Sequence, residues 1–327
     1  MNKKILSVII ALLVMTLLIA GCGSSAPEEK QEVKIALSAW IGYAPLYVAL
    51  EKGFFEDHGV MVDLQMIQSV ADRRTALAAK RIDAFASTVD THVMSAAAGI
   101  DVVQVLALDD SYGGDGIVSK KEINSLQDLK GKTIALHTGG GASYFWLNYL
   151  LNKEGMSMSD MIVKDMSAGD AGAAFVAGKV DAAVTWEPWL TKAKDTDFGK
   201  VLIASNETPG IIVDTLGFRS DFVEANPEAI EAVVKAWYDA VEYAAENPDD
   251  ANAIMATAMD QTVEEFEATL PTVKFYGAEE NKEYFGDDGK SGFIREVSEK
   301  AADLWLEEKL IEQKPDIDAL IDGSYVK

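Results

Sequence analysis

The chain has 327 residues, a formal net charge of −24 and a single cysteine. So acidic a surface makes nucleic acid a poor partner, and one cysteine leaves no pair for a disulfide. The three histidines, His58, His92 and His137, lie in different predicted elements without a partner at ligand spacing. We therefore expect neither a metal site nor a cofactor.

The first 21 residues predict the cellular compartment. Lys3 and Lys4 precede an unbroken apolar run from Ile5 to Ala20. This pattern is typical of a signal segment, and the run is slightly short for a transmembrane anchor, which needs about 18 apolar residues. The last residues before and including Cys22, Ile-Ala-Gly-Cys, resemble the lipobox of bacterial lipoproteins. That resemblance implies cleavage before Cys22, acylation of this cysteine, and a protein anchored on the extracytoplasmic face of the cell membrane.

Cleavage there would leave 306 residues with a charge of −26, because Lys3 and Lys4 are the charged residues that are lost. We expect residues 22–32 to form a flexible tether, since Gly23 to Lys30 is small and polar and cannot bury itself. Acidic charge opposes contact with anionic lipid, which suits a protein held off the membrane on a stem. The alternative is that the acidity only confers solubility.

An internal repeat predicts the architecture. Residues 80–90, KRIDAFASTVD, share the pattern of residues 178–189, GKVDAAVTWEPW, so that Asp83 falls on Asp181 ninety-eight positions later. The segment KIAL at 34–37 likewise has a partner in TIAL at 133–136. Each unit then alternates strands and helices, which predicts an α/β fold of two doubly wound lobes. Ligands bind such lobes outside the carboxyl ends of the strands.

The chain in order fits this division. In the first unit we expect strands at 33–37, 60–67, 82–87 and 102–108, with helices at 44–53, 71–80 and 90–98. In the second unit we expect strands at 116–119, 132–136, 161–166, 180–185, 201–204 and 211–216, and helices at 125–131, 144–154, 170–177 and 188–194. We place the crossovers between the lobes near Asp109 to Gly114 and in Asn206 to Gly210 with Asp214 and Thr215.

The carboxyl-terminal part is expected to contain helices only. Ile230, Val233, Val234, Trp237 and Val241 form one stripe of an amphipathic helix that begins after Asn226 and Pro227. A second long helix is expected from Phe293 to Leu310, with a surface loop before it at 284–292. These helices are predicted to pack on the first lobe, because the chain has just crossed back to it.

Loop residues at the predicted strand ends are the candidates for ligand binding. Four are aromatic and suit a ligand with a flat or apolar part, although any one ring could instead plug the end of a sheet. The other candidates supply polar groups or backbone N–H groups at the same rim. The full set is Ser38, Trp40, Tyr43, Ser69, Arg73, Ser87, Thr88, Asp90, Tyr112, Thr138, Gly140, Ser143, Trp186 and Glu187. For Asp83 and Asp181 we prefer a structural role before a strand.

No catalytic motif accompanies these residues. The glycines at 139–141 are not followed by the Lys-Ser/Thr pair of a P-loop, and no GxSxG turn is present. Leading into a helix amino terminus, these glycines could bind an anion or a carbonyl oxygen, or form an ordinary tight loop. We therefore do not expect an enzyme.

Two motifs in this order behind a lipobox resemble a known family. Gly42 to Phe55, GYAPLYVALEKGFF, and Gly178 to Trp189 are similar to the substrate-binding lipoproteins of nitrate/sulfonate/taurine-type ABC importers, including the branch for pyrimidine precursors of thiamine. The resemblance spans nearly the whole mature chain. It implies a type II periplasmic-binding-protein fold, with 33–110 and 216–327 as one lobe, 111–215 as the other, and a ligand cleft between them. It also implies a monomer that delivers its ligand to an ABC permease with a cytoplasmic ATPase.

The ligand class stays open between two alternatives. The family favours an organosulfonate, nitrate or taurine-like solute, yet few cations are expected near the rim. The acids Asp90, Asp109, Asp110 and Glu187 outnumber Arg73, Arg74 and Lys120 there. A neutral or cationic heteroaromatic, such as a thiamine-related pyrimidine, fits these residues at least as well. A sensory or adhesive lipoprotein is the alternative class of protein. An enzyme of the pyrimidine-synthesis type would need a cysteine or histidine constellation that this chain lacks.

Overall fold

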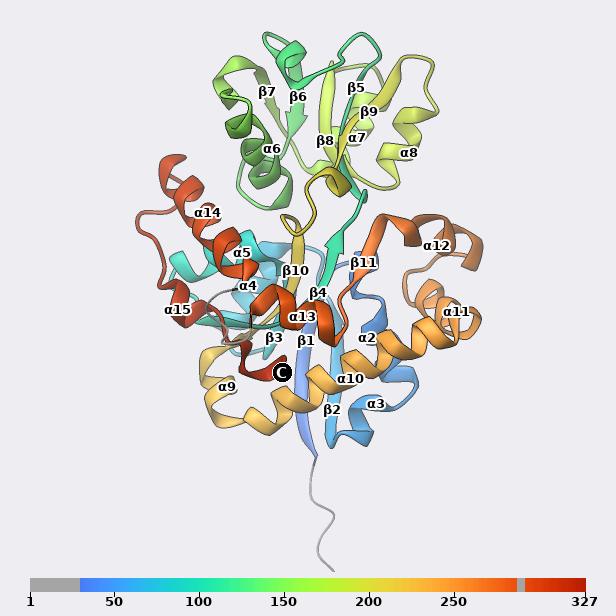
Figure 1. Ribbon diagram of the computed structural model, residues 1–327, viewed down its shortest axis with the longest axis vertical. Coiled ribbons are helices and arrows are strands. Elements are labelled where there is room, and N and C mark those ends of the chain that lie inside the picture. The colour runs from blue at the N-terminus through green and yellow to red at the C-terminus, as the bar shows by residue number, and fades with distance from the viewer. Residues whose placement is uncertain (1–29, 287–291) are drawn as a thin grey trace, which may run out of the picture. The chain divides into compact units, whose positions relative to one another are not determined.

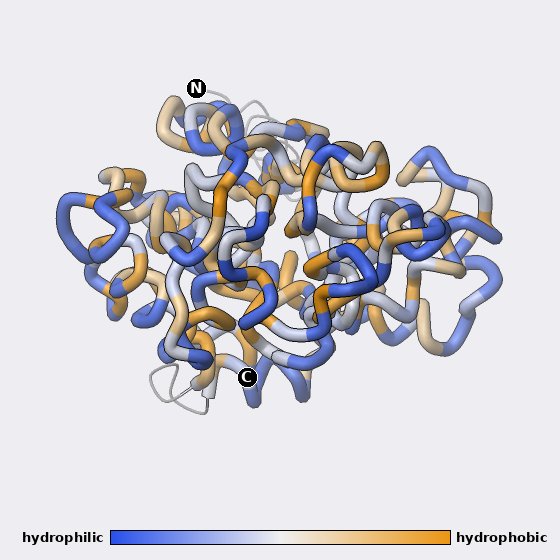
Figure 2. The backbone as a smooth tube through the Cα atoms, turned by 90° about the horizontal axis from the view of Figure 1, so that it is seen from above, coloured by the Kyte–Doolittle hydropathy of each residue, from blue (hydrophilic) through white to orange (hydrophobic). Residues whose placement is uncertain are grey.

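The computed structural model describes residues 30–286 and 292–327, and residues 32–327 form one compact unit. Two mixed β-sheets with helices packed against them make up this unit (Figure 1). Hydrophilic residues gather on the outer loops, whereas hydrophobic stretches run through the interior (Figure 2). In the described ranges no helix is both long and apolar enough to cross a membrane. The signal segment and Cys22 lie outside the described residues.

The first sheet has the strand order β11-β4-β10-β3-β1-β2. Its strands β1 and β3 are parallel, and β10 runs antiparallel between β3 and β4. The strands are β1 (Gln31–Leu37), β2 (Val60–Met66), β3 (Ala84–Thr88), β4 (Val102–Ser111), β10 (Val213–Arg219) and β11 (Val273–Phe275). The helices between its first strands are α2 (Pro45–Glu51), α3 (Phe54–Asp57), α4 (Val70–Ala78) and α5 (Val89–Ala97).

The second sheet has the order β7-β6-β8-β5-β9. Its strands are β5 (Asp115–Lys120), β6 (Thr133–Leu136), β7 (Ile162–Asp165), β8 (Ala182–Trp186) and β9 (Gly199–Ala204). Its helices are α6 (Ala142–Lys153), α7 (Ala168–Val176) and α8 (Trp189–Lys194). Strands β6, β7 and β8 are parallel, and β5 runs antiparallel beside β8.

The two sheets repeat one another, as the sequence predicts. The order β2-β1-β3 in the first sheet corresponds to β7-β6-β8 in the second, and an antiparallel strand, β10 or β5, follows in each. Ile35 pairs with Ala84 in the first sheet, and Ile134 pairs with Ala182 in the second. The repeat is therefore confirmed down to the register of the central parallel strands.

Two repeat-related aspartates hold these central strands in place. Asp83 accepts a hydrogen bond from the N–H of Lys34 at 2.9 Å, and Asp181 accepts one from the N–H of Thr133 at 3.0 Å. Each carboxylate also pairs with a cation on the antiparallel strand: Arg219 lies 3.2 Å from Asp83, and Lys120 lies 2.6 Å from Asp181. Each aspartate thus joins three adjacent strands, which confirms the structural role preferred for it.

The carboxyl-terminal part differs from the expectation in two respects. Most of it is helical: α9 (Ser220–Ala225), α10 (Pro227–Glu246), α11 (Pro248–Ala258), α12 (Val263–Thr269), α13 (Ala278–Phe285), α14 (Phe293–Glu307) and α15 (Ile317–Leu320). The predicted apolar stripe of α10 is buried from Ile230 to Trp237 and half-buried at Val241. However, β11 adds a short strand beside β4, too short for alternation to reveal it. Of the expected loop at 284–292, Tyr284 and Phe285 belong to α13, and 287–291 lie outside the described residues.

The crossings between the sheets are shorter than the sequence suggests. Strand β4 continues to Ser111, where it pairs with Val273 of β11, and β10 already begins at Val213. Asp109, Asp110, Asp214 and Thr215 are therefore strand residues of the first sheet, not parts of a crossover. The chain crosses at 112–114 and returns through 205–212. The lobe bounds inferred from the sequence stay a prediction.

Candidate ligand-binding cleft

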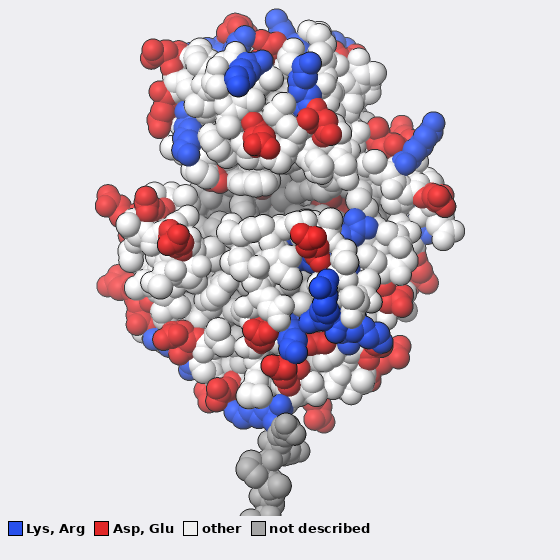
Figure 3. All heavy atoms as spheres, turned by 180° about the vertical axis from the view of Figure 1, so that it is seen from behind, with Lys and Arg blue, Asp and Glu red and all other residues white. Residues whose placement is uncertain are grey.

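The strand ends that face the cleft come from both sheets. In the first sheet, Asp214 at the start of β10 lies opposite Thr88 at the end of β3 and opposite Asp109 near the end of β4. In the second sheet, Asp115 at the start of β5 lies opposite Trp186 at the end of β8. A groove runs between the two lobes on the face shown in Figure 3. The crossing segments thus bring the polar edges of both sheets together.

Four buried carboxyls gather at these edges: Asp90 at the start of α5, Asp109, Asp115 and Asp214, none more than 6% exposed. Burial, followed by the charge of neighbouring aspartates, raises the pKa of Asp109 well above its usual range. Burial is also the largest cause that raises the pKa of Asp90 and of Asp214 to about 7 and that of Asp115 to about 6. The charge of Asp115 in the second lobe is among the causes that raise the pKa of Asp90 and of Asp214 in the first lobe.

The loop after β1 closes on two of these carboxyls. The indole N–H of Trp40 donates to Oδ1 of Asp109 at 2.8 Å, and the hydroxyl of Tyr43 donates to Oδ1 of Asp214. Gly42 lies directly on Asp109, since a Cβ at this position would be 2.0 Å from the carboxyl carbon. Trp40 and Tyr43, predicted as ligand contacts, thus orient acidic side chains in this state.

A hydrogen-bonded network ties the two crossing segments together. Ser111 Oγ donates to Asp115 Oδ2 at 2.7 Å and lies 2.9 Å from the hydroxyl of Ser205, which also accepts from the N–H of Gly113. Beside it, Asp110 accepts from the N–H of Gly210 at 2.9 Å. Burial raises the pKa of Asp110 to about 7. The outgoing and returning chains therefore meet through short polar side chains.

Several buried polar atoms in this region have no hydrogen-bond partner within the described part of the chain. They include Oδ2 of Asp90, Oδ2 of Asp109, Oδ1 of Asp110, Nε of Arg73 and Nδ1 of His92. The guanidinium of Arg73 donates to the carbonyls of Ile67 and Gln68 at 2.6 and 3.1 Å, and burial lowers its pKa. Burial also lowers the pKa of His92 to about 3, so its ring is neutral at physiological pH.

The other predicted residues fall into two groups. Ser87, Thr88, Gly140 and Ser143 are buried at the ends of β3 and at the start of α6, and Trp186 and Tyr112 are 40% and 46% exposed. Their role in ligand binding stays a prediction. A Cβ on Gly140 would lie 2.1 Å from Cε of Met94, which shows how closely the lobes approach at this loop.

The remaining predicted residues make local contacts. Ser69 is the exposed N-cap of α4 and accepts from the N–H of Asp72 at 3.3 Å. Thr138 donates its N–H to Asp165 at 2.8 Å, and the carbonyl of Ser38 accepts from the N–H of Trp40. Glu187 accepts from both the N–H and the hydroxyl of Thr191 at 3.0 Å. Its carboxylate therefore holds the start of α8 instead of lying free at the rim.

Three of the four clustered carboxyls were not among the sequence candidates, and of these only Asp109 was named as an acid near the rim. Asp214 interrupts the apolar run IIVDTLGF, and a polar residue in such a strand was a usable signal. Asp115 gave no comparable signal, because its place depends on β5 pairing with both β8 and β9.

A second contact between the lobes lies on one side of the cleft. The ring of Tyr144 in α6 stacks on Trp305 in α14 with centroids 6.0 Å apart, and its hydroxyl donates to Glu308 at 2.8 Å. The indole N–H of Trp305 donates to the carbonyl of Asp90 at 3.1 Å. Through Trp305, this contact therefore connects Tyr144 of the second lobe with the backbone of Asp90 in the acidic cluster.

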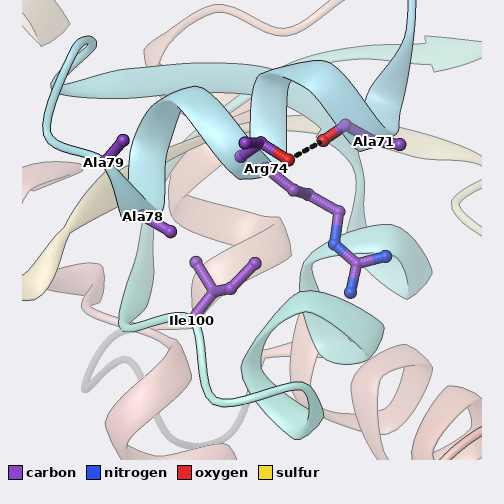
Figure 4. Close-up of a pocket in the computed structure, with 6 residues that line it drawn as sticks. Ala71, Arg74, Ala78, Ala79 and Ile100 are labelled. Carbon is purple, nitrogen blue, oxygen red and sulfur yellow. Dashed lines mark hydrogen bonds between the residues drawn. The ribbon is translucent and has the colours of Figure 1, made fainter.

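A pocket of about 600 Å³ lies elsewhere, on the flank of the first lobe. It is lined by α4 and by Ile100, and Arg74 is the charged residue in its wall, reaching from α4 toward α5 (Figure 4). Arg74 lies 3.5 Å from the carbonyl of Met94. The pocket shares no residue with the acidic cluster, and its alanine-rich wall offers few polar groups.

Comparison with known proteins identifies the family and the fold. The family model described as NMT1/THI5 like matches residues 40–251, more than half of the chain. The chain belongs to this family. Its structure is similar to the periplasmic aliphatic sulphonate binding protein of Escherichia coli, with a TM-score of 0.73 and 20% identity over 88% of this chain and 96% of that one. The two-lobed periplasmic-binding-protein fold expected from the sequence is thus confirmed.

Two proteins with similar sequences are named after different ligands. A Bacillus subtilis (strain 168) protein, provisionally named an aliphatic sulfonates-binding protein, is 28% identical over 98% of this chain and 95% of its own length. The formylaminopyrimidine-binding protein of Halalkalibacterium halodurans is 23% identical over 93% of this chain and 96% of its own length. Similarity to these relatives therefore leaves both predicted ligand classes in place.

Proposed function

We propose that this protein is the extracytoplasmic solute-binding component of an ABC importer. It encloses a small organic molecule between its lobes and delivers it to a membrane permease driven by a cytoplasmic ATPase. The observation that carries this proposal is the repeat of one α/β unit. The polar strand ends of the two copies face the same cleft, with Asp109 and Asp214 on one side and Asp115 and Trp186 on the other. Binding at the carboxyl ends of strands in such folds supports it.

The cleft supports binding better than catalysis. His92, the histidine nearest to the cluster, is fully buried against Phe85 with ring centroids 4.6 Å apart, and it is neutral. A buried, neutral ring cannot reach a solute to exchange a proton with it. The carboxyls and aromatic side chains of the cleft suit recognition without a covalent step.

We further propose that Cys22 carries a lipid anchor on the extracytoplasmic face of the membrane. The lipobox resemblance supports this proposal, and two or three acyl chains hold a protein far more durably than one. In fractionated cells the Cys22→Ser variant should leave the membrane fraction, whereas a Ser24→Ala variant should remain in it. A Cys22→Ser protein that stays as membrane-bound as the parent would contradict the anchor.

Resemblance to named relatives suggests two classes of ligand. The names of the relatives make an organosulfonate the leading class and a heteroaromatic such as a thiamine-related pyrimidine the alternative. The second class has an observation of its own, because the cleft holds four buried carboxyls from two lobes. Carboxylates accept hydrogen bonds from ring N–H and amino groups of heterocycles.

Uptake and scattering together test the importer function. Cells that lack this protein should lose high-affinity uptake of the solute that stabilises the purified protein in a thermal-shift screen, and the gene should restore it. The same solute should reduce the radius of gyration, because it closes the lobes about 112–114 and 205–212. Unchanged uptake together with an unchanged radius would refute the importer role and favour a sensory or adhesive lipoprotein.

A further inference from the structure

We infer that the ligand carries a positively charged nitrogen group with N–H donors, and that the carboxyls of Asp90, Asp109, Asp115 and Asp214 bind this group. The inference rests on the proposed function and names the class of solute. It differs from what the sulfonate-binding relatives suggest, since a bare sulfonate would enter the cleft with the same sign of charge as its walls. The ligand would thus carry a positive charge, whereas the names of the sulfonate-binding relatives imply a negative one.

The first argument is the density of buried acids. Asp109 and Asp214 sit opposite each other on neighbouring strands, and Asp115 of the second lobe and Asp90 of α5 are near enough to Asp214 for their charges to raise its pKa. Each of these carboxyls is at least nine-tenths buried. Carboxylates buried together repel one another and lose their hydration, so the arrangement is costly until a cation enters. A bound cation would therefore offset this repulsion and the loss of hydration.

The second argument is the set of free acceptor atoms. In the described ranges, Oδ2 of Asp109 and Oδ2 of Asp90 are buried without any donor, although Oδ1 of Asp109 is held by Trp40. A buried carboxylate oxygen normally accepts at least one hydrogen bond. When these carboxyls are ionised, the missing partners are donors, which an ammonium, amidinium or protonated pyrimidine supplies and a sulfonate does not.

The third argument is that the neighbouring cation is already engaged. Arg73 is near enough to Asp214 to lower its pKa, yet its guanidinium donates to the carbonyls of Ile67 and Gln68. Lys274 has a similar influence on the pKa of Asp110, which lies at the margin of the cluster. These cations do not neutralise four acids, so the local charge of the cleft is negative when the carboxyls ionise.

The fourth argument concerns the exposed aromatic residues. Trp186 lies opposite Asp115 across the β5–β8 pair, and Tyr112 follows Ser111 in the crossing segment. Both keep large exposed surfaces beside the buried carboxyls. An aromatic face next to a carboxylate attracts organic cations through the ring quadrupole as well as through charge. A metal ion is a poorer fit, since in the described residues no three His, Cys, Asp or Glu side chains are placed to hold one.

Matched pairs of probes test this inference with the full chain. In titration calorimetry, benzamidinium should bind and benzenesulfonate should not, and ethylammonium should bind more tightly than ethanesulfonate. Asp109→Asn and Asp214→Asn should each weaken the bound cation by about ten- to a hundred-fold, since each removes a charge-assisted hydrogen bond. Asp101→Asn, an exposed aspartate of the same lobe outside the cleft, should leave the affinity unchanged.

A second measurement does not depend on how the variants fold. The cation should bind the parent protein more tightly at about pH 8 than at about pH 5, and it should release protons, because its charge favours ionised carboxylates. An anion should show the opposite dependence. The titratable and charged groups facing this site are Tyr43, Arg73, Asp90, His92, Asp109, Asp110, Asp115, Asp214 and Lys274.

The outcomes separate this inference from the importer proposal. An anion that binds, closes the lobes and binds more tightly to Asp109→Asn would overturn the charge inference and leave the importer proposal intact. Saturable binding of zinc or calcium alone, with no organic cation bound, would also overturn it. Failure of every probe of either charge, together with unchanged solute uptake in cells lacking the protein, would count against both.

Discussion

Gly42 shows how one missing side chain shapes the cleft. A Cβ there would lie 2.0 Å from the carboxyl carbon of Asp109, well inside contact distance. Gly42→Ala should therefore displace Asp109, break its hydrogen bond with Trp40, and lower the free energy of unfolding by about 1–3 kcal/mol. Ligand affinity should fall with it. Chemical denaturation and calorimetry measure both effects.

A matched glycine provides the control. Gly169 in α7 has only an ordinary contact, 3.7 Å from the indole nitrogen of Trp189. Gly169→Ala should be neutral or slightly stabilising, because alanine has the higher helix propensity. Equal stability losses in the two variants would show that the approach of Asp109 to Gly42 is not the cause.

The buried aspartates make the stability of the ligand-free protein depend on pH. Asp214 has a folded-state pKa of about 7 against an ordinary 3.8, mainly because it is buried. Between these values the folded protein binds protons that the unfolded chain has already lost. The free energy of unfolding should therefore fall as the pH rises from about 4 to about 7 and level off above it.

Thermal unfolding at about pH 5 and about pH 8 checks this expectation. The parent should melt at the lower temperature at about pH 8, and Asp214→Asn should show a smaller difference between the two pH values, since it removes one titrating group. Asp101→Asn should behave like the parent. A parent protein that is more stable at the higher pH would mean that the cluster is ionised and satisfied in the folded state.

At the scale of elements, one aspartate in each sheet fixes three strands. Asp181→Ala should free the N–H of Thr133 and the amine of Lys120, and Asp83→Ala should do the same to Lys34 and Arg219. Each change should cost about 1–2 kcal/mol, since these side chains are partly exposed. Hydrogen exchange localises the effect: Asp181→Ala should speed exchange in β6 but not in β1, and Asp83→Ala should do the reverse.

Loss of protection in both sheets from either variant would contradict this division. It would show that the sheets open as one cooperative unit rather than as separate ones. A double variant with Lys120→Ala isolates the ion pair in the second sheet, because the coupling between the two changes measures their interaction.

The sequence predicted elements well where its signal was periodic or repeated. The strands around Asp83 and Asp181, the helices after them and the stripe of α10 all follow from local pattern and the offset between the two units. Strand β11 was missed because three residues carry no alternation. The cleft was predicted less completely: the loop residues lie beside it, but Asp115 enters through pairing with a distant strand, and the hydrogen bonds of Glu187 to Thr191 depend on side-chain geometry.

For the molecule as a whole, the contact of Tyr144 with Trp305 and Glu308 holds the lobes together on one side. Tyr144→Ala should remove both the stacking and the hydrogen bond, and the ligand-free protein should become more open. Affinity should fall in proportion to the lost population of the closed form. Small-angle scattering should show a larger radius of gyration, and calorimetry a larger Kd.

Two milder variants grade this effect. Tyr144→Phe keeps the ring and loses only the hydrogen bond to Glu308, so it should lie between the parent and Tyr144→Ala. Tyr149→Phe changes the same helix where the ring lies 5.4 Å from the amine of Lys153, and it should match the parent. If Tyr144→Ala leaves both radius and affinity unchanged, the contact does not bias the lobes.

The way the chain crosses twice between the sheets also sets the order in which they can be completed. All strands of the second sheet come from one continuous stretch, 115–204. The residues that flank this stretch meet where the hydroxyl of Ser111 lies 2.9 Å from that of Ser205. The first sheet needs strands that come before the second sheet in the chain and strands that come after it, and the last of these, the edge strand β11, ends at residue 275. A chain that emerges amino end first therefore finishes its second sheet while the first still lacks β10 and β11. The second sheet is therefore the first whose strands are all available for pairing during synthesis.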